Sequence, residues 1–186
     1  GRQEDWEQLV VVAGRRWGGA DVLLNVAGVL RPAGTLDVTP ADVHTHVDVN
    51  VKGVMLGTVA FAKLMAKQVE SGELPCGGHI VNFSSLGAIA PVSGVGLYIG
   101  TKAACRSFSL CAAKDLAPHG VYVTAVCPDA IQTPMVDLQL RYKESSMAFS
   151  GGILTLDDVE DAIFSHVLPN RPREVLLPTS VFRGKM

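Results

Sequence analysis

The apolar positions of this chain alternate between a helical and an extended period. Between residues 6 and 17 they recur at helical spacing, which predicts an amphipathic helix that ends at the two glycines that follow. Residues 22–24 are apolar on both faces, as is typical of a buried parallel strand. A Thr-Pro pair then predicts the start of a long helix over residues 39–69. The first third of the chain therefore predicts helix, strand, helix.

The same alternation continues to the end of the chain. It predicts strands at 79–85, 121–126 and 174–177 and helices at 97–117 and 155–167. Thr155 and Asp158 have the spacing of a capping box at the start of the last helix. Residues 127–154 show no clean period. No internal repeat or linker interrupts this order, so we expect one α/β domain over residues 1–186, with a mostly parallel sheet.

Composition and charge narrow the possible partners. The 186 residues are 48% hydrophobic and 18% charged, which suits one domain with a sizeable core. The formal net charge is −2, and no block of Lys or Arg appears, so nucleic acid and anionic membranes are not expected partners. The longest apolar stretch, residues 51–66, is interrupted by Lys52 and Lys63, so no membrane span is predicted.

Cysteine and histidine positions argue against disulfides and metal sites. Cys76, Cys105, Cys111 and Cys127 form no C-x-x-C pair and lie in apolar contexts, which predicts reduced, buried thiols in a cytoplasmic protein. His44 and His46 diverge if they lie on a helix, and the other histidines are scattered, so no metal site is predicted.

Candidate chemistry lies where the strand ending at residue 85 meets the next helix. Tyr98 and Lys102 are four residues apart and project from one face of that helix. A cation about 6 Å away would lower the pKa of a phenol by about two units from its reference of about 10. Ser85, thirteen residues before Tyr98, ends the strand in the usual ligand crevice of an α/β sheet. A hydroxyl that holds a carbonyl oxygen and a phenol that protonates it predict a carbonyl reductase or alcohol dehydrogenase. Ser84 is the alternative candidate for this role. Because successive side chains of a strand point to opposite faces, Ser84 is expected to point away from the face that Ser85 occupies.

These residues, in this order, resemble the short-chain dehydrogenase/reductase family over nearly the whole chain. Asn25-Val26-Ala27-Gly28 is similar to the family's Asn-Asn-Ala-Gly turn, and Asn50 matches its helix asparagine. Ser85, Tyr98 and Lys102 match its other catalytic positions. The resemblance implies a Rossmann-like doubly wound sheet and an NAD(P)-dependent oxidoreductase that interconverts an alcohol and a carbonyl.

The resemblance also implies residue roles. Tyr98 would be the acid/base, Ser85 would polarise the substrate oxygen, Lys102 would hold the nicotinamide ribose, and the Asn50 carbonyl would hold a relay water. The expected catalytic set is Asn50, Ser85, Tyr98 and Lys102. The expected cofactor-binding set is Asn25, Ala27, Gly28, Tyr98, Lys102, Pro128, Ile131 and Thr133, with NAD or NADP as the cofactor. The resemblance places the residues that would select between NAD and NADP upstream of this sequence.

Two departures from the family pattern stand out. Asp129 occupies a position where the family has glycine, near the expected nicotinamide face. The family's Gly-x-x-x-Gly-x-Gly turn, which holds the pyrophosphate at a helix start, has no counterpart here. Gly14, Gly18 and Gly19 precede a strand instead of following one, so they predict a helix stop. The expectation is a truncated domain that lacks about three strands at its start, with the outer edge of strand 22–24 left open.

Several alternatives stay open at this level. A non-catalytic fragment that acts as an oligomerising or interaction domain is one, and an epimerase or dehydratase step with a tightly held cofactor is another. The resemblance implies a homodimer or homotetramer through the two long helices. The expected substrate is an apolar alcohol or ketone. Its site is expected to be lined by Leu86, Ile89, Val92, Val95 and Met135. The loop 135–154 is expected to set its specificity.

Overall fold

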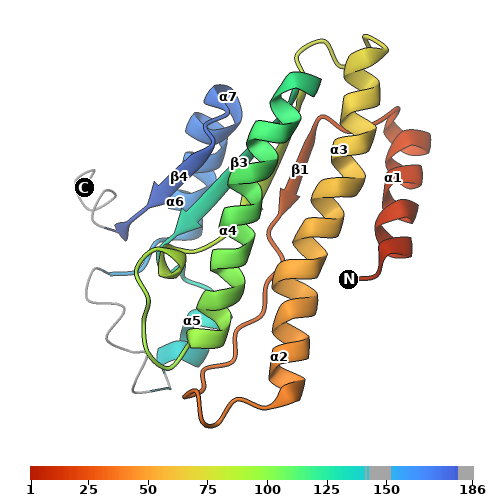
Figure 1. Cartoon of the computed structure of the whole chain (residues 1–186). Helices are drawn as coiled ribbons and strands as arrows, with labels where there is room; N and C mark the ends of the chain where they lie inside the picture. Colours follow the sequence, from red (N-terminus) through yellow and green to blue (C-terminus); the bar gives the residue numbers. More distant parts are fainter. Residues whose placement is uncertain (141, 143–151, 180–186) are drawn as a thin grey trace.

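Four parallel strands form the central sheet in the described part of the chain (Figure 1). The computed structural model describes residues 1–140, 142 and 152–179. The strands are β1 (Val22–Asn25), β2 (Gly78–Phe83), β3 (Val121–Pro128) and β4 (Glu174–Leu177). They lie side by side in sequence order, and all three pairings are parallel. Their carboxyl ends therefore meet at one edge of the sheet, where ligands of α/β proteins bind.

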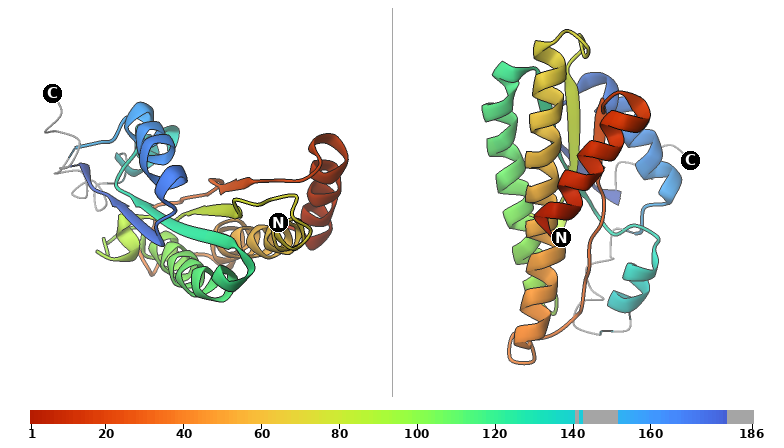
Figure 2. Two further views of the ribbon diagram at one scale, coloured as in Figure 1. Left: turned by 90° about the horizontal axis from the view of Figure 1, so that it is seen from above. Right: turned by 90° about the vertical axis from the view of Figure 1, so that its right-hand side faces the viewer.

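Helices cover both faces of this sheet, which confirms the predicted doubly wound architecture (Figure 2). On one face lie α3 (Val54–Glu70) and α4 (Gly96–Leu116), and on the other lie α6 (Leu156–Asp161) and α7 (Leu168–Asn170). The described residues also form α1 (Gln3–Trp17), α2 (Pro40–His46), α5 (Pro134–Leu140), the π-helical segments η1 (Val47–Gly53) and η5 (Ala162–Val167), and the 3-10 turns η2 (Leu86–Ala88) and η3 (Ala117–His119).

Each face of the sheet has its own hydrophobic core. The core under α1, α3 and α4 includes Phe61, Met65, Ile80, Val121 and Val123. The core under α6 and η5 includes Val81, Phe83, Val126, Ile163 and Val167. Alternate residues of β2 supply the two cores, as the period of a strand requires.

The predicted helix boundaries agree with the observed ones. Gly18 has a φ of 78° and donates its N–H to the Gly14 carbonyl, so these glycines end α1 as expected. Thr39 and Thr155 each form a complete capping box. The irregular segments inside the predicted helices were not predicted. The long helix over residues 40–70 contains the π-helical segment η1, and the helix predicted over residues 155–167 contains the π-helical segment η5. Helix α5 forms in the stretch that shows no period.

β1 is an edge strand within the described part of the chain, because it pairs only with β2 there. The side chains of Val22 and Leu24, which point to the same face of the sheet, are exposed, and so is Val26 just after the strand. The expectation of an open edge at this strand therefore holds for the described residues.

The cysteines and the long helix modify two expectations. All four cysteines are free, but only Cys105 and Cys127 are buried; Cys76 and Cys111 are exposed, so the prediction of buried thiols was wrong for these two.

The 31-residue helix Pro40–Glu70 is long and apolar enough to cross a membrane by length and composition alone. It buries Phe61 and Met65 against the sheet, which is the position of a core helix. The described residues contain no group of three or more His, Cys, Asp or Glu side chains that could hold a metal ion.

Candidate active site

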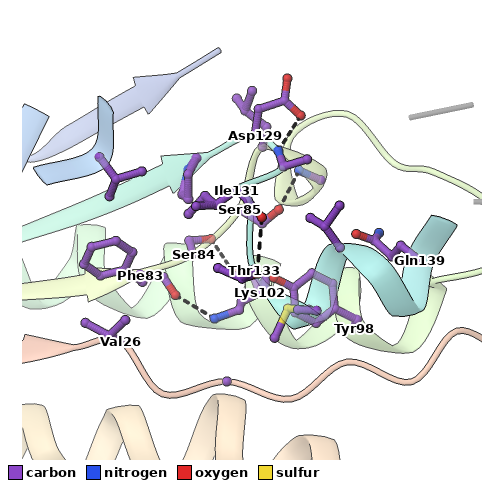
Figure 3. Close-up of a pocket in the computed structure, with 18 of the residues that line it drawn as sticks. Val26, Phe83, Ser84, Ser85, Tyr98, Lys102, Asp129, Ile131, Thr133 and Gln139 are labelled. Carbon is purple, nitrogen blue, oxygen red and sulfur yellow. Dashed lines mark hydrogen bonds between the residues drawn. The ribbon is translucent and has the colours of Figure 1, made fainter. Parts of the chain in front are cut away.

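The two serines at the end of β2 are used differently. The Ser84 side chain is buried and donates a hydrogen bond to the Lys102 carbonyl at 2.8 Å. Ser85 lies just beyond the strand, where its oxygen accepts a hydrogen bond from the Gly87 amide at 3.1 Å. A serine hydroxyl that accepts one hydrogen bond still has its own hydrogen to donate, here to the Tyr98 oxygen or to a ligand. Ser84 therefore fastens α4 to the strand, and Ser85 faces the cavity described below (Figure 3).

Helix α4 brings Tyr98 and Lys102 to the same face, as the spacing predicts. The Lys102 ammonium nitrogen lies 5.8 Å from the centroid of the Tyr98 ring. It donates a hydrogen bond to the Phe83 carbonyl at 2.8 Å, and the whole residue is 3% exposed. The end of β2 therefore aims the lysine side chain at the point where the strand opens into the cavity.

Burial changes the acidity of both groups. It raises the pKa of Tyr98 to about 12, while a hydrogen bond with Ser85 acts in the opposite direction. Burial also lowers the pKa of Lys102. The expectation that Lys102 makes this phenol acidic was therefore wrong for the chain by itself. Lys102 turns its ammonium group to the Phe83 carbonyl, and the loss of hydration of a phenolate outweighs the attraction of the cation.

Asn50 lies in η1 and is fully buried. Its side-chain oxygen accepts a hydrogen bond from the Val29 amide at 2.8 Å, and its amide nitrogen donates to the Val29 carbonyl at 2.9 Å. The same nitrogen donates to the Thr101 hydroxyl at 3.0 Å, and that hydroxyl donates to the Tyr98 carbonyl. Asn50 thus ties the turn after β1 to the helical turn that carries Tyr98 and Lys102.

The turn after β1 places its residues in two environments. The Asn25 side chain is buried on the α3 side of the sheet, where it donates to Asn82 at 2.8 Å and to Thr58 at 3.4 Å. Neither Asn25 nor Ala27 lines the cavity, but Gly28 does. A Cβ atom on Gly28 would lie 3.3 Å from the Lys102 ammonium nitrogen. Asn25 therefore joins β1 to β2, and Gly28 leaves room above the lysine.

The segment after β3 forms the opposite wall. Pro128, Ile131 and Thr133 line the cavity, as expected. The Thr133 hydroxyl donates a hydrogen bond to the Ile131 carbonyl at 3.2 Å. Ile131 pairs with Leu154 in a short parallel bridge, which fixes this loop against the chain that leads into α6.

These walls enclose a cavity of about 720 Å³ at the carboxyl ends of the strands. Of the expected apolar lining, Leu86, Val92, Val95 and Met135 are present, whereas Ile89 is 44% exposed and lies outside the wall. Val136 and Gln139 of α5 also line the cavity, and they fall within the stretch 135–154 that was expected to set specificity. The lining residues from α6 and η5 were not predicted: Leu156, Val159, Glu160, Ile163 and Phe164. The helical spacing of apolar residues after the Thr155 cap was the signal that could have found most of them. Most of the expected specificity loop, 141 and 143–151, lies outside the described residues.

Comparisons with known proteins agree with this geometry. A family model described as short chain dehydrogenase matches residues 1–143. A diacetyl reductase, (S)-acetoin forming, from Staphylococcus epidermidis is 30% identical over 173 residues, which cover 93% of this chain and 63% of that protein. A probable oxidoreductase, EphD, from Mycobacterium tuberculosis is 40% identical over 87% of this chain and 28% of its own length. The chain thus spans less than two thirds of either relative.

A solved structure has the same fold. The crystal structure of a 3-ketoacyl-(acyl-carrier-protein) reductase from Brucella melitensis, complexed with NADH, superposes with a TM-score of 0.80 at 26% sequence identity. The match covers 95% of this chain and 72% of that one.

Proposed function

Because this chain belongs to the short-chain dehydrogenase family, we propose that it carries the catalytic site of an NAD(P)-dependent oxidoreductase that interconverts an alcohol and a carbonyl compound. The single observation that carries the proposal is the convergence of Ser85, Tyr98 and Lys102 on one cavity at the carboxyl ends of the strands. The relatives named above are reductases or an oxidoreductase, and one solved neighbour binds NADH.

The residues present suit a nicotinamide riboside. The Lys102 ammonium group has three N–H donors, and its bond to the Phe83 carbonyl uses one of them. The others can donate to ribose hydroxyls above Gly28, where the absence of a side chain lets a ligand approach. Thr133 and the backbone around Ile131 lie on the opposite wall, where they can contact the carboxamide. The volume of about 720 Å³ is in the usual range for a ligand site.

The bound dinucleotide would supply or accept the hydride, and the protein would handle the proton. In the reduction direction, the Ser85 hydroxyl donates a hydrogen bond to the substrate oxygen, and the Tyr98 phenol transfers its proton to that oxygen. With a pKa of about 12, Tyr98 carries its proton at neutral pH, which suits reduction. Asn50 and Thr101 hold the helical turn that positions Tyr98.

The cavity wall indicates the substrate class. The apolar residues Val92, Val95, Ile99 and Met135 belong to the same hydrophobic cluster as Tyr98, and Leu86 lines the same cavity. We therefore propose an apolar ketone or alcohol as the substrate, with recognition mainly by burial of its hydrocarbon groups.

The proposed assembly is a homodimer or homotetramer through the two long helices. Val43, Val47 and Val59 share one side of the helix Pro40–Glu70 and are 40–44% exposed. A stripe of exposed valines on a helix is suited to an isologous contact with a second copy. The domain itself is proposed to be a single, partial Rossmann-type unit over residues 1–186.

Replacement of Tyr98 by phenylalanine tests the proposed chemistry. The purified protein is assayed for oxidation of NADH and NADPH with a series of aliphatic and aryl ketones. We expect the Tyr98→Phe variant to lose about 100-fold or more in turnover, because the proton donor is removed. Its affinity for NAD(P)H should stay within about twofold, since the ring remains.

Tyr122→Phe is the matched control. Tyr122 lies at the start of β3, whereas the cavity lies at the carboxyl end of that strand, and the Tyr122 ring stacks on Arg171. This variant should retain full turnover. Ketone reduction at the unmodified rate by Tyr98→Phe would overturn the proposal.

A further inference from the structure

The residue that departs from the family pattern, Asp129, makes a specific set of contacts at the end of β3. It stands where the resemblance places a glycine, yet among the described non-glycine residues only Arg171 has a positive φ. Asp129 therefore needs no left-handed backbone in this chain. What distinguishes Asp129 from a glycine here is therefore the set of contacts that its side chain makes.

Both oxygens of the Asp129 carboxyl group are occupied. One accepts a hydrogen bond from the Ala130 amide at 2.9 Å, and the other accepts from the Thr179 hydroxyl at 3.1 Å. The Asp129 amide donates to the Leu177 carbonyl at 3.0 Å. Thr179 is 5% exposed and follows β4, so these bonds join the segment after β3 to the segment after β4.

The loop beyond Asp129 is held on its other side as well. The Gln132 amide donates to the Leu154 carbonyl at 2.8 Å, and the Leu154 amide donates to the Ala130 carbonyl at 2.8 Å. Between these anchors Ile131 faces the cavity, and Thr133 follows directly. Figure 3 shows Asp129 at the opposite end of the cavity wall from Tyr98 and Lys102. Its carboxyl group is thus directed at the protein frame and away from the reacting groups.

We propose that Asp129 is a positioning residue whose carboxyl group, together with Thr179, fixes the loop 129–133 in the conformation that presents Ile131 and Thr133 to the nicotinamide. A glycine at this position could make neither side-chain bond. In this chain the Asp129–Thr179 pair is therefore the side-chain link that fixes the loop. The part of the inference that concerns the nicotinamide rests on the proposed function, but the fixing of the loop does not.

Amide hydrogen exchange in the 186-residue chain tests the positioning role without any cofactor. The reporter is the Gln132 amide, because it bonds to Leu154 and does not touch Asp129. We expect it to exchange about tenfold faster in Asp129→Ala and in Thr179→Val, since each change removes a hydrogen bond worth roughly a factor of ten in equilibrium. The two effects should be far from additive in the double variant, because both remove the same link.

Two further variants serve as controls. Asp129→Asn should restore slow exchange, because its oxygen can accept from Ala130 while its amide donates to the reoriented Thr179 hydroxyl. Asp157→Ala, at an exposed carboxyl group in the first turn of α6, should leave the Gln132 amide unchanged. If Asp129→Ala does not fold, the isosteric Thr179→Val and the Asn variant still decide the question. Unchanged Gln132 exchange in Thr179→Val, or fast exchange in Asp129→Asn, would overturn the proposal.

Cofactor affinity tests the second half of the proposal. The dissociation constants of NADH and NADPH are measured for the same variants, and the cofactor that binds should bind about tenfold more weakly to Asp129→Ala and Thr179→Val than to Asp129→Asn. Faster exchange with unchanged affinity would overturn the role toward nicotinamide. If the unmodified chain binds neither cofactor, the proposed function fails for this chain together with that role, while the exchange data still decide whether Asp129 fixes the loop.

Discussion

At the scale of single residues, burial has a larger effect on Tyr98 than its cationic neighbour has. The Tyr-x-x-x-Lys spacing correctly predicts that both side chains share a face of α4, but not the acidity of the phenol. The Lys102 ammonium group lies 2.8 Å from the Phe83 carbonyl and 5.8 Å from the centre of the tyrosine ring. Sequence spacing cannot show the Phe83 carbonyl, because that acceptor belongs to a strand about twenty residues away. The sequence therefore predicts which side chains share this face of α4 better than it predicts their acidity.

The protonation state of Tyr98 is directly measurable. Because burial favours the neutral phenol, its pKa is about 12, above its ordinary value, and the phenolate should be absent through neutral pH. The tyrosinate absorbance of the Tyr98→Phe variant is subtracted from that of the unmodified chain at each pH. We expect no Tyr98-dependent signal below about pH 10 in the folded chain, and a signal with a midpoint near pH 10 in denaturant as the control. A folded-state midpoint near pH 8, the value that attraction by Lys102 alone predicts, would contradict this account.

At the scale of elements, the boundaries of the helices were predictable and their internal irregularities were not. The capping residues Thr39 and Thr155 and the stop at Gly18 mark boundaries with local chemistry that can be read from the sequence. The π-helical segment η1 leaves no such local mark. It lies where Asn50 bonds to both backbone groups of Val29, so it depends on a contact between two distant segments. Helix α5 also lacks a sequence period, because it is only seven residues long.

Two glycines in the long helices should respond to alanine with opposite signs. A Cβ on Gly57 in α3 would lie 2.8 Å from the Trp6 ring and 3.0 Å from the Asn25 side-chain oxygen, whereas a Cβ on Gly100 in α4 would meet nothing within 4 Å. We expect Gly100→Ala to stabilise the fold by up to about 1 kcal/mol, because alanine favours the helix. Gly57→Ala should destabilise it by about 1–2 kcal/mol, since overpacking costs more than this gain.

Urea unfolding of the two variants measures this difference in the free energy of unfolding. Each variant acts as the control for the other, because the substitution and the type of element are the same. Equal stabilisation by both alanines would show that Trp6 does not pack closely against α3.

At the scale of the whole molecule, the order of strands along the chain was enough to predict the sheet and the place of the site. Each strand that alternates with a helix joins a parallel sheet, and the candidate residues Ser85 and Gly28 follow strand ends, so they meet at one edge. The part of the wall contributed by α6 and η5 was not predicted. It reaches the site only because these elements cross to the second face of the sheet. The helical spacing after Thr155 indicates which residues of these elements are apolar on one side, whereas the face of the sheet that they cover is set by tertiary packing.

Hydride transfer at the cavity that holds Ser85, Tyr98 and Lys102 is the central proposal. The most direct test follows deuterium from NADH or NADPH, labelled at the transferable position of the nicotinamide ring, to the product of an apolar ketone. We predict one deuterium on the carbinol carbon with the unmodified protein, located by mass spectrometry or NMR, and no labelled product above background with Tyr98→Phe. An alcohol product without deuterium on that carbon, or equal labelling by the Tyr98→Phe variant, would contradict the account.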